Sequence, residues 1–259
     1  MPEVLRSLLE ALTRNWQWRS TLGPRYGRAP VVISPSGGLK HLAMSVARCH
    51  GPLLAAVDEL VRPGHVVWDI GANLGIFGVA AAVRAGSEGL VYCFEPDAWL
   101  VQLLRRSAFL QAATTAPLIV VPAAVGEEVA VRTFNIARRS RAMSHLGGHG
   151  AIGCQSTRQS ETVVALGVDW LASRIPPPDV IKIDVEGAEL EVLRGGQALL
   201  RQRRPRIYCE VTDRNVPQVT ALLTSLGYNL FDGDDAAASR QPVRMATFNT
   251  IAIPAEETP

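Results

Sequence analysis

The chain has 259 residues, 47% hydrophobic and 19% charged, so it can bury a full core and is not a disordered protein. Its 26 basic and 24 acidic residues give a net charge of +2, which is too balanced to predict nucleic acid as a partner. The four cysteines lack metal-ligand spacing, no apolar run approaches the ~20 residues of a membrane span, and the N-terminal stretch is charged. We therefore expect a cytoplasmic protein with reduced thiols and no membrane contact.

Residues 1–60 are predicted to form a helical extension of the domain that follows. Apolar residues recur at helical spacing over residues 2–20, which indicates an amphipathic helix. A Gly- and Pro-rich stretch follows, with residues 31–33 as a candidate edge strand, and residues 53–61 are predicted to form a second helix. Three roles are open for this extension: packing on the same core, covering a ligand site, or contacting a second subunit in a homodimer.

Residues 66–77 hold the most informative stretch of the chain. An apolar run containing Asp69 leads into a glycine turn and then an alanine-rich helix. This order places backbone N–H groups at the carboxyl end of a buried strand, where α/β sheets bind ligands. Gly71 and Gly75 permit backbone angles and close approaches that a side chain would prevent. Asn73 stands where the dinucleotide fingerprint has its second glycine, so the turn is not that fingerprint.

The next apolar run ends in Glu95-Pro96-Asp97. An acid at the tip of the second strand, about 20 residues past the glycine turn, can accept hydrogen bonds from a ribose diol. Pro96 suits the start of the next helix, because its missing N–H would go unpaired there in any case. The turn lacks the lysine or threonine of a phosphate site, whereas Asp69 suits an ammonium group. Ribose and an amino acid together point to S-adenosylmethionine as the ligand.

Strand and helix signals alternate through the rest of the chain and predict a parallel sheet with helices on both faces. Residues 118–121 are the third strand, and the small residues after it, including Ala124, leave room for a flat adenine ring. Residues 136–160 break the pattern and are interpreted as a lid or a disordered loop. The apolar runs at 228–231 and 247–253 have no room for a helix between them, so they predict an antiparallel hairpin at the sheet edge.

Two further predicted strands end in acids, Asp184 and Glu186 on one and Glu210 on the other. We hypothesise that these three line the acceptor side of the site and are candidate catalytic residues, with Asp184 the first candidate for a catalytic or cofactor contact. Glu186 is equally suited to cap the helix that follows it. Lys182 points away from its apolar neighbours and is expected to form a structural ion pair with an acid such as Asp69.

The loop over residues 136–160 adds candidate side chains. His145 and His149 are candidate bases on a lid, with a solvated loop as the alternative. Three arginines could steer an anionic acceptor: Arg138, Arg139 and Arg141. A divalent metal is not favoured, because nothing in the spacing fixes the geometry of its candidate oxygen ligands, Asp184, Glu186, Glu210 and Asp213.

Three stretches together resemble the FkbM-type S-adenosylmethionine-dependent methyltransferases: Asp69-Ile-Gly-Ala-Asn-Leu-Gly75, Phe94-Glu-Pro-Asp97 and Ile181-Lys-Ile-Asp-Val-Glu-Gly-Ala-Glu189. The resemblance implies a class I methyltransferase fold over residues 61–259, an α/β fold with a Rossmann-like, mostly parallel seven-stranded sheet. It also implies methylation of a hydroxyl on a small natural product or sugar, with S-adenosylhomocysteine as the product. The residues that match cofactor positions of the family are Asp69, Gly71, Asn73, Gly75 and Glu95.

One departure is that Ser107 stands where the family usually has asparagine. Two alternative functions stay open at this point. The glycine turn with Glu95 also suits an NAD-dependent oxidoreductase, which Asn73 and the terminal hairpin oppose. The other alternative is a non-catalytic partner subunit that keeps the fold.

Overall fold

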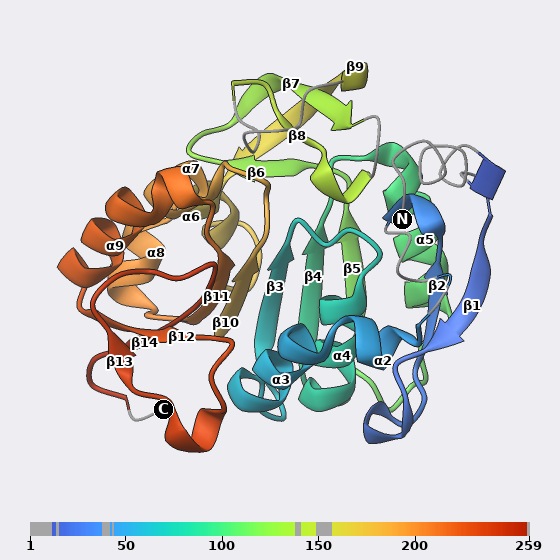
Figure 1. The fold of residues 1–259 in the computed structure, drawn as a ribbon, viewed down its shortest axis with the longest axis horizontal. Coiled ribbons are helices and arrows are strands. Elements are labelled where there is room, and N and C mark those ends of the chain that lie inside the picture. The colour runs from blue at the N-terminus through green and yellow to red at the C-terminus, as the bar shows by residue number, and fades with distance from the viewer. Residues whose placement is uncertain are drawn as a thin grey trace, which may run out of the picture.

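The computed structural model describes residues 12–13, 16–37, 42, 44–137, 141–148 and 157–257. A mixed eight-stranded sheet forms its centre, with helices on both faces and a smaller sheet over one end (Figure 1). The strands of the central sheet, in spatial order, are β13 (Pro242–Val243), β12 (Tyr228–Asp232), β14 (Asn249–Pro254), β11 (Arg206–Glu210), β10 (Val180–Ile183), β3 (Val66–Ile70), β4 (Leu90–Phe94) and β5 (Leu118–Val121).

The sheet is parallel from β11 to β5 and antiparallel from β11 to β13. The predicted hairpin is present as β12 and β14, with β14 lying between β12 and β11. The predicted count of seven strands is wrong, because the short strand Pro242–Val243 pairs with Leu230 and Phe231 of β12 and adds an eighth. A strand this short has no hydrophobic period that a sequence could reveal.

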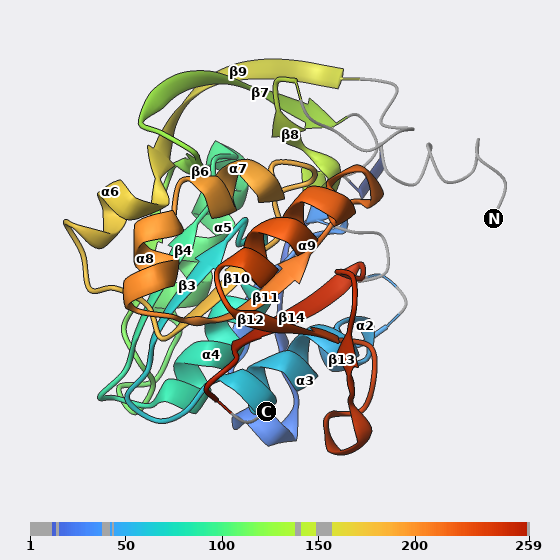
Figure 2. The ribbon, with the colours of Figure 1, turned by 90° about the vertical axis from the view of Figure 1, so that its left-hand side faces the viewer.

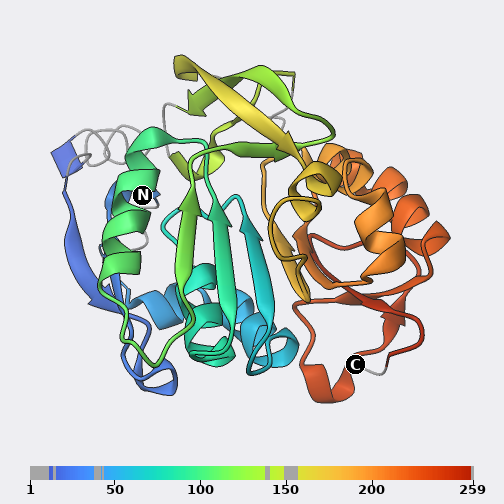
Figure 3. The same cartoon turned by 180° about the vertical axis from the view of Figure 1, so that it is seen from behind.

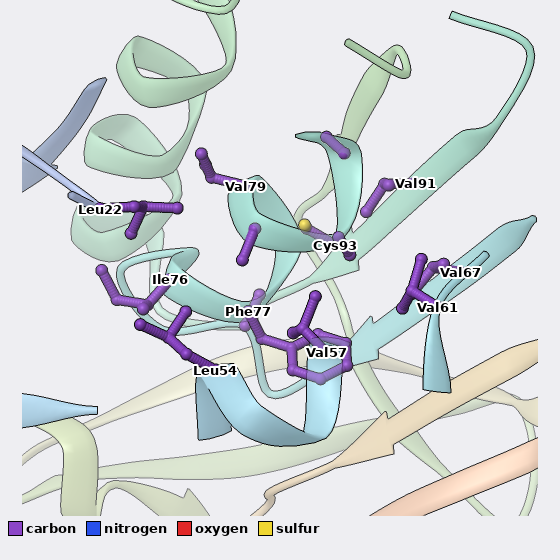
Figure 4. Packing of buried hydrophobic residues seen from close by; sticks show 14 of the residues in the cluster. Leu22, Leu54, Val57, Val61, Val67, Ile76, Phe77, Val79, Val91 and Cys93 are labelled. Carbon is purple, nitrogen blue, oxygen red and sulfur yellow. The ribbon is translucent and has the colours of Figure 1, made fainter. Parts of the chain in front are cut away.

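Helices cover both faces of the sheet, because its strands present apolar side chains on both faces and these must be buried. The helices are α2 (Val46–Cys49), α3 (Gly51–Leu60), α4 (Ile76–Ala85), α5 (Ala98–Phe109), α6 (Val168–Ala172), α7 (Glu189–Arg194), α8 (Gln197–Gln202) and α9 (Val216–Ser225), with 3₁₀ turns η5 (Asp213–Asn215) and η6 (Ala237–Ser239). Val67 of β3 belongs to the core with α3, α4 and α5, whereas Trp68 belongs to the core with α6 to α9. Figure 4 shows the first core, where Leu54 and Val57 of α3 lie close to Phe77 of α4.

A second sheet lies over the carboxyl ends of the parallel strands (Figure 2). Its strands, in spatial order, are β6 (Ala124–Gly126), β9 (Thr157–Gly167), β7 (Ala130–Ala137) and β8 (His145–Leu146). The predicted loop over 136–160 is therefore too long, because β7 reaches Ala137, β9 begins at Thr157, and η4 (Arg141–Met143) and β8 lie between them. Residues 138–140 and 149–156 lie outside the described residues.

The N-terminal segment contains strands as well as helices. The predicted helix over residues 2–20 is wrong at its C-terminal end, because β1 (Trp18–Thr21) pairs antiparallel with β2 (Pro30–Ile33). Residues 31–33 do form a strand, but it belongs to this two-stranded sheet. Most of residues 1–15 lie outside the described residues. The 3₁₀ turns of this segment are η1 (Pro24–Tyr26) and η2 (Pro35–Gly37).

Ser107, the departure from the family pattern, fixes the two-stranded sheet of β1 and β2 to α5. Its Oγ accepts a hydrogen bond from the backbone N–H of Val32 (2.8 Å) and donates one to the carbonyl of Leu103 (3.2 Å). The side chain is fully buried. Since a buried backbone N–H that loses its partner is costly, the serine has a structural role at this contact.

Candidate functional site

The loop between β3 and α4 forms the floor of the candidate site, and its glycines are required for its shape. Gly71 has a φ of +74°, and a Cβ there would lie 1.8 Å from the carbonyl oxygen of Asp184. Gly75 has a φ of +79°, and a Cβ there would lie 2.1 Å from Leu104 Cδ1. The N–H of Gly71 donates to the carbonyl of Phe94 at 3.0 Å. The predicted backbone angles and close approaches at both glycines are confirmed.

A buried lysine connects this loop to the sheet. Lys182 Nζ lies 3.1 Å from Asp69 Oδ1 and 3.4 Å from Asp184 Oδ2, and it donates a hydrogen bond to the carbonyl of Gly71 at 2.6 Å. Burial lowers the pKa of Lys182, but the carboxylates of Asp69, Asp184 and Glu210 more than offset this and raise it overall. The ammonium group therefore stays protonated, and the predicted ion pair is present.

Asp69 lies behind the site and does not line it. Its side chain has no exposed surface, and its second carboxylate oxygen accepts a hydrogen bond from the N–H of Gly78 at 3.0 Å. The predicted direct contact between Asp69 and an ammonium group of the ligand needs correction, because Lys182 already occupies that carboxylate. Asp69 acts on the site through the positions of Lys182 and α4.

A first pocket, the β4 pocket, lies at the carboxyl end of β4 beneath the four-stranded sheet. Its cavity volume is about 50 Å³. The predicted site residues that line it are Gly71, Asn73, Glu95, Pro96, Ala124, Asp184 and Glu186. Because pockets for small ligands usually have volumes of ~300–1,000 Å³, a nucleoside requires the covering side chains to move apart. These covering side chains include Phe134, Arg141 and Leu146.

Glu95 is held at the rim of the β4 pocket by backbone donors. Its Oε2 accepts from the N–H of Asn73 at 2.8 Å, and its Oε1 accepts from the N–H of Asp97 at 2.9 Å. Burial raises its pKa to about 7, although these two N–H groups lower it. Each carboxylate oxygen has a further lone pair, so the group can still accept hydrogen bonds from a ligand diol.

A second pocket, the β11 pocket, lies on the other side of the loop and has a cavity volume of about 380 Å³. The β11 pocket is lined by groups from three parts of the chain. Residues 49, 50, 52 and 53 form a wall from the N-terminal segment. The carboxylates of Asp184, Glu186 and Glu210 face the cavity from the sheet, next to Lys182 and Tyr208. The N-terminal segment thus forms part of a site wall, which was one of the roles left open for it.

The two pockets meet at Asn73, Asp184 and Glu186, which line both. Asn73 has a φ of +51°, a conformation that asparagine tolerates better than most residues. Its Oδ1 is buried and has no hydrogen-bond partner among the described residues. An unpaired amide oxygen beside carboxylates fits a ligand that carries both a hydrogen-bond donor and a positive charge.

Glu186 does not cap the helix that follows it. Helix α7 starts at Glu189, and its N-cap position, Ala188, has no side-chain hydrogen bond. The side chain that turns back is that of Glu189, which accepts from the N–H of Gly187 at 2.5 Å. Burial, followed by repulsion from Asp184 and Glu210, raises the pKa of Glu186 to about 8.

Ser144 and Leu146, just before and in β8 of the four-stranded sheet, line the β4 pocket. His145 lines neither pocket. His145 is buried, and its Nδ1 lies 3.3 Å from the carbonyl of Met143. Because neighbouring strand residues point to opposite sides, Leu146 faces the pocket and His145 does not. The role of His145 as a base therefore needs correction. Arg138, Arg139 and His149 lie outside the described residues.

Arg141, one of the three arginines considered for steering an anionic acceptor, lines the β4 pocket. Arg141 forms an ion pair with Asp97, which also caps α5 by accepting from the N–H of Trp99 at 2.9 Å. The Arg141 guanidinium lies 5.0 Å from the centre of the Trp99 ring. The helix-capping signature of Asp97 is readable in the sequence, but its ion pair with Arg141 depends on tertiary contacts.

No group of three or more His, Cys, Asp or Glu residues that could hold a metal ion occurs within the described part of the chain. Asp213, one of the four acids considered as metal ligands, begins η5 and lines neither pocket.

Comparison with known proteins gives a consistent group of relatives. A family model for the methyltransferase FkbM domain matches residues 69–230, more than half of the chain. The hexuronic acid methyltransferase AglP of Haloferax volcanii is 30% identical over 139 residues, 53% of this chain and 52% of that protein. The chain thus spans about half of the length of this curated relative.

Two solved structures are also similar. A methyltransferase FkbM from Methylobacillus flagellatus has 16% identity and a TM-score of 0.45, covering 77% of this chain and 50% of that chain. An S-adenosylmethionine-dependent O-methyltransferase from Thermotoga maritima has 10% identity and a TM-score of 0.44, covering 89% of this chain and 75% of that chain.

Proposed function

Because this chain belongs to the methyltransferase FkbM family, we propose that it transfers a methyl group from S-adenosylmethionine to a hydroxyl of a sugar or a similar small polyol. The observation that carries the proposal is the meeting of two pockets at Asn73, Asp184 and Glu186. One pocket suits a nucleoside and the other an acceptor, so their shared boundary is where a methyl group would pass.

The fold is the expected class I methyltransferase fold, with one added strand. Its parallel strands run β5, β4, β3, β10, β11, and the antiparallel β14 is inserted between β11 and β12. The oxidoreductase alternative is set aside, because the family match is to a methyltransferase domain.

The residues of the β4 pocket fit S-adenosylmethionine chemically. Glu95 offers carboxylate oxygens to the ribose, and Asn73 offers its unpaired Oδ1 to the ammonium group. The small residues Ala123 and Ala124 leave the flat surface that an adenine ring needs. When bound, the cofactor supplies an already activated methyl group on its sulfonium.

The protein has two remaining tasks, which are to align the acceptor oxygen and to take up its proton. Alignment alone can supply ~7–11 kcal/mol of the barrier. We assign the proton to Glu186, because it borders both pockets, whereas Lys182 engages the carboxylate of Asp184. Glu210 and Asn249 offer oxygens from the sheet side to the other hydroxyls of a polyol.

A screen of hydroxylated acceptors with isotope-labelled S-adenosylmethionine, followed by mass spectrometry, tests the proposal. We expect a labelled methyl group on a hydroxyl oxygen of a sugar or polyol. A chain that binds the cofactor but labels no acceptor in the screen would favour the partner-subunit alternative.

Replacing Glu95 with glutamine is expected to weaken binding of S-adenosylhomocysteine by about 1.5–3 kcal/mol, because hydrogen bonds to a charged group are lost. Isothermal titration calorimetry measures this directly. Glu88→Gln is the matched control, since Glu88 is exposed and lies before the opposite end of β4. Equal affinities of Glu95→Gln and the unchanged chain would show that Glu95 does not hold the ribose.

The acidic wall of the β11 pocket is expected to disfavour acceptors that carry a carboxylate. Among otherwise matched sugars, we expect kcat/KM for a hexuronic acid to be at least about tenfold below that for the neutral hexose. Glu210→Gln should narrow this difference, and initial rates with both sugars would show it. An unchanged preference in Glu210→Gln would remove Glu210 from the acceptor wall.

A further inference from the structure

Two segments of this chain contain basic residues but no acids, although the whole chain is close to neutral. Residues 11–57 contain six basic residues and no Asp or Glu, and residues 98–126 contain two arginines and no Asp or Glu. The second segment includes α5, which packs against β2 of the first, and α5, β1 and β2 lie side by side in Figures 1 and 3. The basic residues of the two segments are Arg14, Arg19, Arg25, Arg28, Lys40, Arg48, Arg105 and Arg106.

Three of these arginines line a third cavity, which shares no lining residue with the β4 and β11 pockets. Arg19 of β1 and Arg105 and Arg106 of α5 line a cavity of about 270 Å³, together with Val32, Phe109 and Leu110. Arg106 Nη1 donates a hydrogen bond to Gln17 Oε1 at 2.6 Å, which joins α5 to the start of β1. Within the described ranges, no carboxylate forms an ion pair with these three guanidinium groups. The cavity therefore has positive charge that the described residues leave unbalanced.

Three large apolar side chains of these two segments are also exposed, and one of them, Phe109, lines the cavity. Phe109, at the end of α5, is 90% exposed, and Trp16, which precedes Gln17, is 58% exposed. Leu12 is 65% exposed. Exposed apolar side chains clustered beside a charged pocket mark an interaction surface more often than single exposed ones do.

We propose that this basic apolar face, formed by Leu12, Trp16, Arg19, Arg105, Arg106 and Phe109, docks the protein on the surface of an anionic lipid bilayer. Arginines bind lipid phosphates, and tryptophan and phenylalanine bury at the boundary between headgroups and acyl chains. A protruding leucine and phenylalanine gain from burial in hydrocarbon, which nucleic acid does not provide. Within the described residues, no helix is both long and apolar enough to cross a membrane. This proposal revises the expectation that the protein makes no membrane contact.

The test is co-sedimentation of the full chain with vesicles of phosphatidylcholine alone or mixed equally with phosphatidylglycerol. We expect binding to the mixed vesicles, loss of most binding at high salt, and little binding to phosphatidylcholine alone. Since each basic residue contributes about fivefold, Arg105→Glu/Arg106→Glu should weaken partitioning at least about 20-fold. Phe109→Ser should weaken binding to the mixed vesicles at low salt, and it should also weaken the binding that remains at high salt. Arg194→Glu/Arg201→Glu makes the same charge change on α7 and α8 and should bind like the unchanged chain.

Both arginines and Phe109 are exposed, so the variants are expected to keep the thermal unfolding temperature of the unchanged chain. Equal binding to neutral and mixed vesicles, or full binding by Arg105→Glu/Arg106→Glu, would overturn the proposal. Two other occupants are separate outcomes that would also overturn it. These are a dimer that Phe109→Ser converts to a monomer in light scattering, and a gel shift with RNA in the absence of vesicle binding.

Discussion

Replacing Lys182 with methionine is expected to lower the free energy of unfolding by about 3–5 kcal/mol, because it leaves a buried carboxylate without its partner. Asp69 has no exposed surface, and Lys182 Nζ is 3.1 Å from its Oδ1. The same ammonium group donates to the carbonyl of Gly71, so the loop below both pockets loses its connection to β10. Chemical denaturation followed by circular dichroism measures the change.

The double variant Asp69→Asn/Lys182→Met distinguishes a lost ion pair from a general packing defect. If the uncompensated charge is the main cost, neutralising Asp69 should recover a large part of the lost stability. Arg203→Met is the surface control, because Arg203 pairs with Asp179 while about half of its side chain is exposed, and such pairs contribute about 0–1 kcal/mol. A loss below 1 kcal/mol for Lys182→Met, or no recovery in the double variant, would contradict this account.

The parallel part of the central sheet was predictable because its strands are buried on both faces. Such strands appear as continuous apolar runs, and the acids that follow them, Glu95, Asp184 and Glu210, mark the ends where ligands bind. The family motifs on these strands made the fold class readable in the sequence. The pockets confirm that these three side chains gather at one edge of the sheet.

The remaining differences arise from contacts between segments that lie far apart in the sequence. Trp18–Thr21 continues a helical apolar pattern, but pairing with Pro30–Ile33 makes it a strand. His145 and Leu146 are neighbours in a two-residue strand, which turns Leu146 toward the β4 pocket and His145 away from it. The sequence does not show which of the two faces the pocket. Asp69 is a suitable ligand for an ammonium group, and the structure supplies one from within the chain, that of Lys182. Sequence gives the chemistry of such a group, and tertiary packing decides which partner it meets.

Glu186→Gln is expected to lower kcat by about 10²–10⁴-fold, the usual contribution of a positioned general base. The glutamine keeps the size of the side chain and cannot accept the proton of the acceptor hydroxyl. Binding of S-adenosylhomocysteine should change little, because Asn73 and Glu95 are unchanged. Single-turnover methyl transfer together with calorimetry separates these two effects. Glu128→Gln is a matched control on an exposed residue that lines neither pocket.

The pH profile gives a second, independent test of Glu186. A base must be deprotonated to act, and burial with neighbouring carboxylates raises the pKa of Glu186 to about 8. The rate should therefore rise as pH increases through about 8, with only about a tenth of the full rate at pH 7. In Glu186→Gln this rise should disappear, whereas in Glu210→Gln it should shift to lower pH, because one repelling carboxylate is gone. A rate that does not change from pH 6 to 9 in the unchanged chain would show that a group other than Glu186 accepts the proton. Asp184→Asn would then be the variant to measure.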